Sequence, residues 1–272
     1  MVLQAALSDL DIQFIDALIL EDDTDWDVRI RQQMRRLALS TQALTQPLED
    51  FPGQYADPTY PSPSSEDAGP EIPFDQLPKT TPPTFSPYGD SWDLLWVGHC
   101  GMQMPPPDHR GISRGRVIQK DDDTVVEKRY MYSFASPFTL VDVYPEHTRA
   151  VHHVQEGVCS LGYAVSQKGA RRLLHEVGLK DMSDPFDILL GFYCEGAKGR
   201  RKHMCLATQP GLFQHHRRAG PDRAQSDIGD HGDGYREHSE TDMVRWSARL
   251  NADVLMEGGS VFHDQRPDSD VQ

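Results

Sequence analysis

The sequence predicts an α/β protein built on one mostly parallel sheet with helices on both faces. Two observations favour this class. Several short runs, such as residues 14–20 and 93–98, are apolar apart from one Asp in each, which is typical of strands buried on both faces of a parallel sheet. Residues 26–44 and 167–177 have the patterns of helices that bury one apolar side. We therefore expect these two helices to cover the two faces of the sheet.

Composition narrows the class of protein further. The 272 residues suffice for one large domain or two small ones. The apolar fraction of 38% and the mean hydropathy of -0.59 are low, so part of the chain is expected to be disordered. A net charge of -15 without a long run of Lys and Arg argues against nucleic-acid binding. No apolar stretch has the length of a transmembrane helix, and no basic signal-peptide region starts the chain, so the compartment stays open.

The first predicted element is a strand at residues 14–20, which ends in three consecutive acids at 21–23. A helix over residues 26–44 follows, with Thr24 or Asp25 as its N-cap. Its apolar positions recur at spacings of three and four, which predicts packing against the sheet. These positions are Ile30, Met34, Leu37, Thr41 and Leu44.

Residues 46–90 differ in character from the segment before them. They contain 11 of the chain's 20 prolines, together with Ser, Thr, Gly and acids. Proline lacks a backbone donor, so this segment is expected to form neither a helix nor a central strand. We expect a disordered insertion outside the core, because the entropy cost of closing a loop grows only slowly with its length.

The rest of the chain returns to strand and helix patterns. Ser166 is the predicted N-cap of helix 167–177, and Asp184 with Pro185 predicts the start of another helix. A single domain is expected over residues 1–251, followed by a flexible tail at 252–272. The other predicted elements are strands at 93–98, 139–144, 158–165 and 204–208, and a helix at 241–250.

The four cysteines form no CxxC motif, and they are too few for a disulfide scaffold. A single disulfide is compatible with the sequence, which does not identify its partners. The four are Cys100, Cys159, Cys194 and Cys205.

The acids at the end of the first strand are the strongest candidate for a ligand site. Adjacent carboxylates beside a buried strand are costly unless a cation or strong donors meet them. In open α/β sheets, ligands bind beyond the carboxyl ends of the strands. The oxygen atoms of Glu21 and Asp23 suit Mg²⁺ or Mn²⁺ that carries a phosphorylated substrate. The alternative is a solvated acidic turn that caps the following helix.

Three segments stand in a suggestive order along the chain. They are Ala-Leu-Ile-Leu-Glu-Asp-Asp at 17–23, Leu-Gly-Tyr-Ala-Val-Ser-Gln-Lys-Gly-Ala-Arg-Arg-Leu-Leu at 161–174, and Asp-Pro-Phe-Asp at 184–187. Together they resemble glycosyltransferase family 25, which includes lipopolysaccharide-type glycosyltransferases and procollagen galactosyltransferases. Two further segments, at 26–30 and 245–251, are similar to the version found in filamentous fungi.

This resemblance implies a GT-A-like fold, a Rossmann-type sheet that binds a nucleotide sugar and a divalent cation, Mn²⁺ or Mg²⁺. Glu21, Asp22 and Asp23 match the acidic motif that anchors the donor diphosphate and the metal. Glu21 and Asp23 are then the expected metal ligands. The donor implied is a UDP-sugar, and the acceptor is a glycan or a protein.

The resemblance also assigns residues later in the chain. Asp187 matches an acid that acts as a catalytic base or binds the acceptor, and His215 or His216 adds a metal or phosphate contact. Neighbours on a strand point to opposite faces, so only one of the two histidines can join the site. Acids brought together repel one another unless a cation lies between them. We therefore expect convergence on one cleft, with the Asp23 and Asp187 carboxylates within about 10 Å.

One departure from the family concerns the segment before the acidic motif. Family members have a βαβ portion there, whereas here only a short stretch precedes the acids, so we expect an N-terminally truncated sheet with an exposed edge. The alternative function is a non-catalytic remnant that acts as a binding or interaction module. A third hypothesis is a metal-dependent phosphohydrolase that uses Glu21–Asp23. A zinc hydrolase is not favoured, because the histidines lack HExxH spacing.

Overall fold

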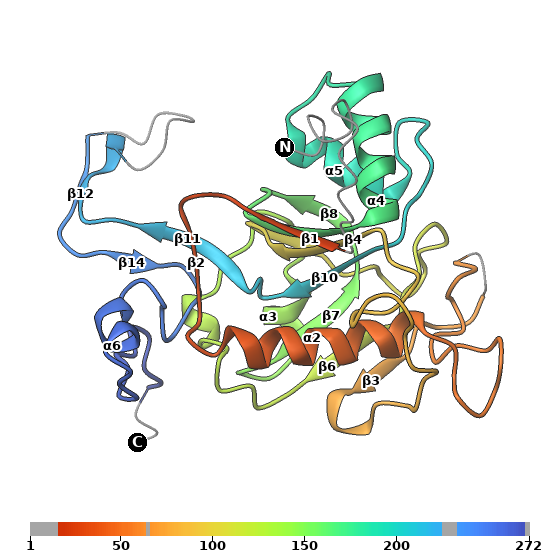
Figure 1. Cartoon of the computed structure of the whole chain (residues 1–272), viewed down its shortest axis with the longest axis horizontal. Helices are drawn as coiled ribbons and strands as arrows, with labels where there is room; N and C mark the ends of the chain where they lie inside the picture. Colours follow the sequence, from red (N-terminus) through yellow and green to blue (C-terminus); the bar gives the residue numbers. More distant parts are fainter. Residues whose placement is uncertain (1–15, 64–65, 225–232, 270–272) are drawn as a thin grey trace.

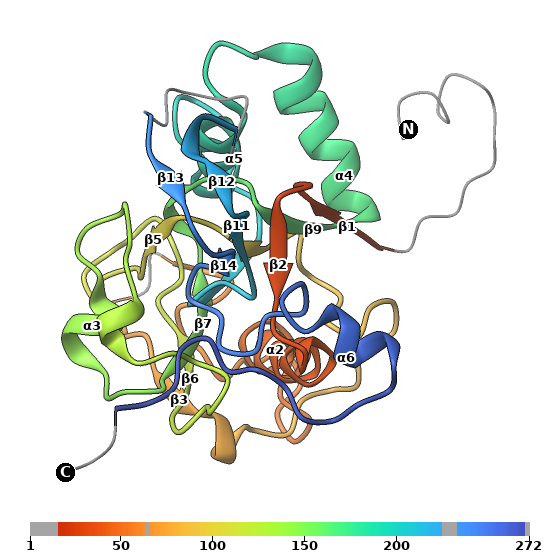
Figure 2. The same cartoon turned by 90° about the vertical axis from the view of Figure 1, so that its left-hand side faces the viewer.

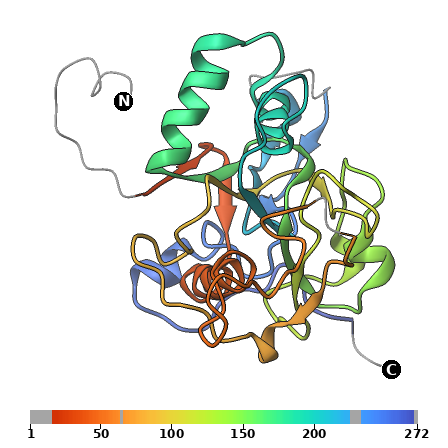
Figure 3. The same cartoon turned by 90° about the vertical axis from the view of Figure 1, so that its right-hand side faces the viewer.

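A computed structural model describes residues 16–63, 66–224 and 233–269 of the chain. Its centre is a seven-stranded mixed sheet with the strand order β1-β9-β4-β10-β7-β6-β3 (Figure 1). Figures 2 and 3 look along α2 and show α2 and α4 on opposite sides of this sheet. The prediction of an α/β fold is confirmed.

The strands of the large sheet are β1(Asp16–Leu20), β3(Glu71–Pro73), β4(Leu94–Gly98), β6(Arg116–Gln119), β7(Arg149–His153), β9(Gly162–Ser166) and β10(Cys205–Gln209). The smaller sheets contain β2(Thr24–Trp26), β5(Gly101–Gln103), β8(Gln155–Val158), β11(Phe213–Arg217), β12(Gly220–Pro221), β13(Tyr235–Arg236) and β14(Glu240–Thr241). The helices are α2(Ile30–Thr45), α3(Thr139–Val143), α4(Gln167–Leu173), the π-helical η3(Leu174–Lys180), α5(Phe186–Glu195) and α6(Ala252–Met256). Short 3₁₀ turns are η1(Phe74–Gln76), η2(Lys128–Tyr130) and η4(Asp222–Ala224).

The large sheet is mostly antiparallel, so the prediction of a mostly parallel sheet is wrong. Its parallel pairs are β4–β10 and β3–β6. The pairs β1–β9, β9–β4, β10–β7 and β7–β6 are antiparallel. A strand covered on both faces is continuously apolar whichever way its neighbours run, so the apolar runs did not reveal the direction.

Each face of the sheet has its own apolar core. Alternate residues of a strand point to opposite faces, and in β4 this divides Leu95 from Trp96. Leu95 packs in a cluster with Leu44 of α2, whereas Trp96 packs in a cluster with Leu173 of α4 and Leu190 of α5. Helix α2 contacts β6 and β7, whereas α4 contacts β9. The helices on the two faces therefore cover different strands of the sheet.

Strand β1 is less buried than its apolar sequence predicts. It forms one edge of the large sheet, and Leu18 and Ile19 are 45% and 37% exposed. The first positions of the predicted strand, 14 and 15, lie outside the described residues. The strand itself is confirmed from Asp16, but its burial on both faces is not.

The proline-rich segment 46–90 contributes to the core, apart from residues 64–65, which lie outside the described residues. Ile72 of β3 joins the cluster beneath α2, and Asp57 is fully buried. The prediction that this segment lies outside the core is therefore wrong, whereas its disorder stays a prediction. Strand β3 forms the second edge of the sheet, where Pro73 is tolerated because an edge strand can lack a ladder donor.

Several predicted boundaries shift. Helix α2 begins at Ile30, because residues 24–26 form strand β2, so neither Thr24 nor Asp25 is its N-cap. Ser166 caps α4 as predicted and accepts a hydrogen bond from the Gly169 amide. Asp184 caps no helix, because α5 starts after Pro185. Residues 139–143 form helix α3 instead of a strand. The helix expected at 241–250 is absent: β14 ends at Thr241, residues 242–250 form turns, and α6 begins only at Ala252.

The tail predicted from residue 252 is held to the body by polar contacts as far as residue 269. Arg245 lies 2.7 Å from Asp264 and 3.0 Å from Asp268. The Gln265 side-chain amide donates to the Thr241 carbonyl at 3.1 Å. These contacts are polar and long-range, so hydropathy gave no sign of them. Residues 270–272 lie outside the described residues.

Two disulfides use all four cysteines, where the sequence suggested at most one. Cys100–Cys159 joins the loop after β4 to the loop before β9. Cys194–Cys205 joins α5 to the start of β10. Across the described ranges, no helix combines the length and apolar character needed to span a membrane.

Candidate functional site

The candidate site lies at the edge of the sheet where β1, β4 and β10 end. These strands run in the same direction, so their carboxyl ends meet at one edge, the usual place for ligands in α/β sheets. Glu21 follows β1, and Cys100 lies just beyond β4. A Cβ atom at Gly98 would lie 2.8 Å from the Gly162 nitrogen and 2.9 Å from the Phe213 oxygen. Only glycine fits where these three chain segments converge.

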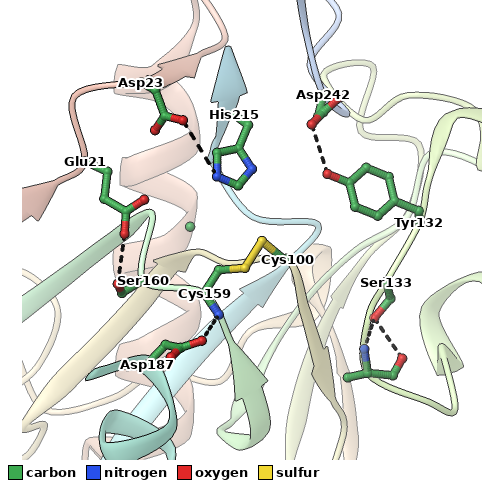
Figure 4. Close-up of a disulfide and its surroundings, with 12 residues drawn as sticks. Glu21, Asp23, Cys100, Tyr132, Ser133, Cys159, Ser160, Asp187, His215 and Asp242 are labelled. Carbon is green, nitrogen blue, oxygen red and sulfur yellow. Dashed lines mark hydrogen bonds and ion pairs between the residues drawn. A yellow bond between two sulfur atoms is a disulfide. The ribbon is translucent and has the colours of Figure 1, made fainter. Parts of the chain in front are cut away.

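Glu21, Asp23 and His215 form a group whose ligand atoms all lie within 4.8 Å of one another (Figure 4). Strand pairing explains the approach: β2 pairs with β11, which places His215 opposite Thr24. The His216 amide also donates to the Asp23 carbonyl at 2.7 Å. The structure thus brings together the three predicted metal ligands from distant parts of the chain.

His216 and Asp22, the chain neighbours of these residues, lie outside the group. His216 Nδ1 lies 3.0 Å from the Thr241 hydroxyl, and burial lowers the pKa of this histidine. Asp22 is exposed, and its backbone carbonyl accepts a hydrogen bond from the Arg249 guanidinium at 2.6 Å. The structure does not place Asp22 in the group with Glu21 and Asp23. Of the two candidate histidines, His215 is the one beside the acids.

Asp187 reaches the same region through the loop before β9. Its Oδ2 accepts a hydrogen bond from the Cys159 amide at 2.9 Å. The next residue, Ser160, donates from its hydroxyl to Glu21 Oε1 at 2.9 Å (Figure 4). Asp187 lies in the first turn of α5, where the helix amides favour a carboxylate. The separation of about 10 Å expected between the Asp23 and Asp187 carboxylates stays a prediction.

The donor set fits a divalent cation. Carboxylate oxygens suit Mg²⁺ and Mn²⁺, and an imidazole nitrogen favours Mn²⁺ of the two. Asp23 Oδ2 lies 3.9 Å from His215 Nε2 and 3.2 Å from Arg217 Nη1. Arg217 is two residues after His215 in β11, so both side chains lie on one face of that strand. A guanidinium in this place can meet either a carboxylate or a phosphate.

The opposite side of the site contains two groups that the sequence analysis did not identify. The Tyr132 hydroxyl donates to Asp242 Oδ2 at 2.9 Å (Figure 4). Burial raises the pKa of Tyr132, and the charge of Asp242 raises it further. The Asp242 amide donates to the His215 carbonyl at 3.0 Å, which fixes this acid beside the metal-ligand group. The two residues are 110 positions apart, so no local pattern could have paired them.

Comparison with protein-family models, curated proteins and solved structures gives no match to this chain. The segments 17–23, 161–174 and 184–187 each contribute a residue to this edge of the sheet, namely Glu21, Leu161 and Asp187. The segment 17–23 forms β1 and its acidic end, 161–174 forms β9 and the start of the helical layer, and 184–187 begins α5. The interpretation of the site depends on this placement and on the geometry of the side chains.

Proposed function

We propose that this protein is a metal-assisted glycosyltransferase of family 25 type with a GT-A-like fold. It would move a sugar from a nucleotide-sugar donor, a UDP-sugar, to a hydroxyl of a glycan or protein acceptor. The observation that supports this function best is the group of Glu21, Asp23 and His215 at the end of a strand. One loop links this group to Asp187, the candidate base.

The proposed transfer exchanges one bond of the sugar for another. The bond between the anomeric carbon and the donor diphosphate breaks, and the acceptor oxygen forms a new bond to that carbon. Negative charge then develops on the leaving diphosphate, and a divalent cation, when bound, neutralises it. Glu21, Asp23 and His215 would hold that cation, and Arg217 adds a positive charge on the same face of β11.

The acceptor hydroxyl loses its proton as the new bond forms, and Asp187 is the candidate to receive it. A positioned base typically contributes about 10²- to 10⁴-fold to the rate. The Cys159 amide holds Oδ2 of Asp187 at 2.9 Å, so the carboxylate has a fixed orientation. Oδ1 is then the atom to which we assign the proton.

A second candidate function is a binding or interaction module without catalysis. The position of β1 favours it, because an edge strand with Leu18 45% exposed offers a template for another chain. Such a module would bind UDP and metal, or a protein partner, without transferring a sugar. A phosphohydrolase would use the same acids with water in place of the acceptor.

Titration calorimetry with Mn²⁺, followed by UDP, tests the proposal. The wild-type protein should bind Mn²⁺, and UDP should bind only when Mn²⁺ is present. Asp23→Asn should weaken Mn²⁺ binding by about 10- to 100-fold. Asp22→Asn is the matched control and should change it by less than about twofold, because Asp22 stands outside the group.

Kinetics then separate the candidate functions. Asp187→Asn should lower kcat by about 10²-fold or more while Mn²⁺ affinity is kept. Binding of UDP and Mn²⁺ without turnover of any UDP-sugar would favour the non-catalytic module. Absence of UDP binding in the presence of Mn²⁺ would contradict both the transferase and the nucleotide-binding module.

A further inference from the structure

We propose that the Cys100–Cys159 disulfide is a positioning device for the metal-ligand group, so that tight binding of the cation requires this bond to be oxidised. The inference rests on the metal site of the proposed function. It adds residues 100, 159 and 160 to that site as positioning residues. Figure 4 shows the disulfide attached to the loop in which the Cys159 amide contacts Asp187 and the Ser160 hydroxyl contacts Glu21.

The disulfide fixes a backbone that is otherwise unfavourable. Cys159 has φ 64°, a left-handed conformation that residues other than glycine adopt rarely. Three contacts hold it there besides the sulfur bridge to Cys100. Its carbonyl accepts from the Trp96 indole at 3.0 Å, and its amide donates to Asp187 at 2.9 Å. The Cys100 amide donates to the Val158 carbonyl at 2.9 Å, so the two loops are joined by backbone as well as by sulfur.

The fixed loop determines where Glu21 lies. The Ser160 hydroxyl donates to Glu21 Oε1 at 2.9 Å, and the Glu21 amide donates to the Leu161 carbonyl at 3.0 Å. Residues 159, 160 and 161 therefore contact, in order, the candidate base, the carboxylate of a metal ligand and the backbone of that ligand. Because Glu21 is exposed, its side chain is not held by packing in the core. The loop at residues 159–161 orients it instead.

The second disulfide lacks these connections. Cys194 and Cys205 are each 3% exposed and pack in the cluster beneath α4 and α5. Their bridge joins α5 to β10, and neither cysteine contacts the acids or His215 through any hydrogen bond of the described residues. Cys194–Cys205 is thus an internal control within the same chain.

Reduction is a two-electron step with a defined co-reactant. Dithiothreitol supplies two electrons and two protons, one S–S bond becomes two thiols, and the reagent closes into its own cyclic disulfide. Cys100 is 3% exposed, as are Cys194 and Cys205, but Cys159 is partly exposed, so the site disulfide has one accessible cysteine and the control disulfide has none. The site disulfide should therefore be reduced first.

Two double variants test the proposal, each with both readouts. For Cys100→Ala/Cys159→Ala and Cys194→Ala/Cys205→Ala, calorimetry gives the Mn²⁺ Kd, and hydrogen exchange in metal-free protein reports the amides of residues 21 and 159. The site variant should weaken Mn²⁺ binding by about tenfold and speed exchange at both amides. The control variant should lower Tm while the Kd changes by less than about twofold.

Ser160 provides a variant that keeps both disulfides. Ser160→Ala should weaken Mn²⁺ binding, and Ser160→Thr should restore it, because threonine keeps the hydroxyl that meets Glu21. An unchanged Kd and unchanged exchange in the site variant would overturn the proposal. If the wild-type protein binds no Mn²⁺, the metal assignment fails. The exchange at residues 21 and 159 then still decides whether the disulfide fixes the loop.

Discussion

Leu18 and Leu95 show how differently two similar strands are buried. Both are cross-strand partners of Ala164, one on each side of β9, so their side chains lie on the same face of the sheet. Leu95 in β4 is 1% exposed and packs in the cluster that contains Leu44 of α2, whereas Leu18 in β1 is 45% exposed. An apolar run therefore indicates a strand, but the neighbours that cover it decide its burial.

The acids next to these two strands differ in burial in the same way as the two leucines. Asp93, next to β4, is 2% exposed and lies 2.8 Å from Arg172. Burial alone would raise the pKa of Asp93, but the nearby His203, the hydrogen bond from the Met204 amide and the charges of Lys168 and Arg172 together outweigh it and lower the pKa. We therefore interpret Asp93 as an acid that stabilises the fold and does not meet a ligand. Glu21, at the end of the edge strand, is exposed and accessible to a ligand.

The largest expected effect is a loss of folding stability in mild acid, because the buried strands β4 and β7 have neutral histidines in or next to them. Burial lowers the pKa of His99, just after β4, to about 4 and that of His152 in β7 to about 3. Unfolded histidine titrates near 6.5, so below that pH the unfolded chain takes up protons that the folded chain cannot. At about pH 5 each of these histidines should lower the free energy of unfolding by about 2 kcal/mol. His153 in β7, whose pKa burial also lowers to about 4, adds a similar amount, which gives about 6 kcal/mol for the three.

Urea unfolding at several pH values measures this effect. Stability should be flat above about pH 7 and fall steadily between about pH 6.5 and pH 4. Buried acids with lowered pKa, such as Asp93 and Asp122, lose their contribution only below their ordinary value of 3.8, so they leave this window unchanged. His99→Gln should flatten the slope by about a third, because His152 and His153 keep their share. A slope that this variant leaves unchanged would contradict a neutral, buried His99.

The second expected effect is the cavity left by Leu95→Ala. Removing a fully buried leucine side chain typically lowers the free energy of unfolding by 2–5 kcal/mol, and we expect about 3 kcal/mol here. Leu95 is surrounded in the core by residues of both α2 and the central strands, which limits collapse around the cavity. Chemical denaturation gives the value directly. A change below about 1 kcal/mol would show that this half of the sheet is less covered than its burial indicates.

The difference in burial between the strands also explains which of them could be predicted from the sequence. Strands β4 and β10 were found because their residues are apolar and fully buried. Strand β7 was missed although it is equally buried, because it ends in His152 and His153, whose neutral buried state has no signal in composition. Strand β3 was missed because Pro73 suggested a loop. The direction of the strands depends on long-range pairing, which no local pattern contains.

The site was predictable only for residues that a local pattern or the family resemblance singled out. Glu21, Asp23 and His215 were named because acids after an apolar run and a late histidine have recognised chemistry, and the structure brings them together. Ser160 and Asp242 were not named. Their roles arise from contacts with residues more than a hundred positions away in sequence, at separations of 139 and 110. Contacts of that kind become visible only in three dimensions.

The smallest expected effect completes the comparison. Leu18→Ala makes the same chemical change as Leu95→Ala, on the same face and beside the same Ala164. Because Leu18 is 45% exposed, truncation removes only about half as much buried area as at Leu95 and leaves no closed cavity. We expect the free energy of unfolding to fall by about 1 kcal/mol, clearly less than for Leu95→Ala. If Leu18→Ala instead costs as much as Leu95→Ala, the outer face of β1 is covered in solution by a surface that contacts it. The edge of the sheet would then be an interface, and the same denaturation series, repeated at several protein concentrations, would show whether that surface is a second copy of the chain.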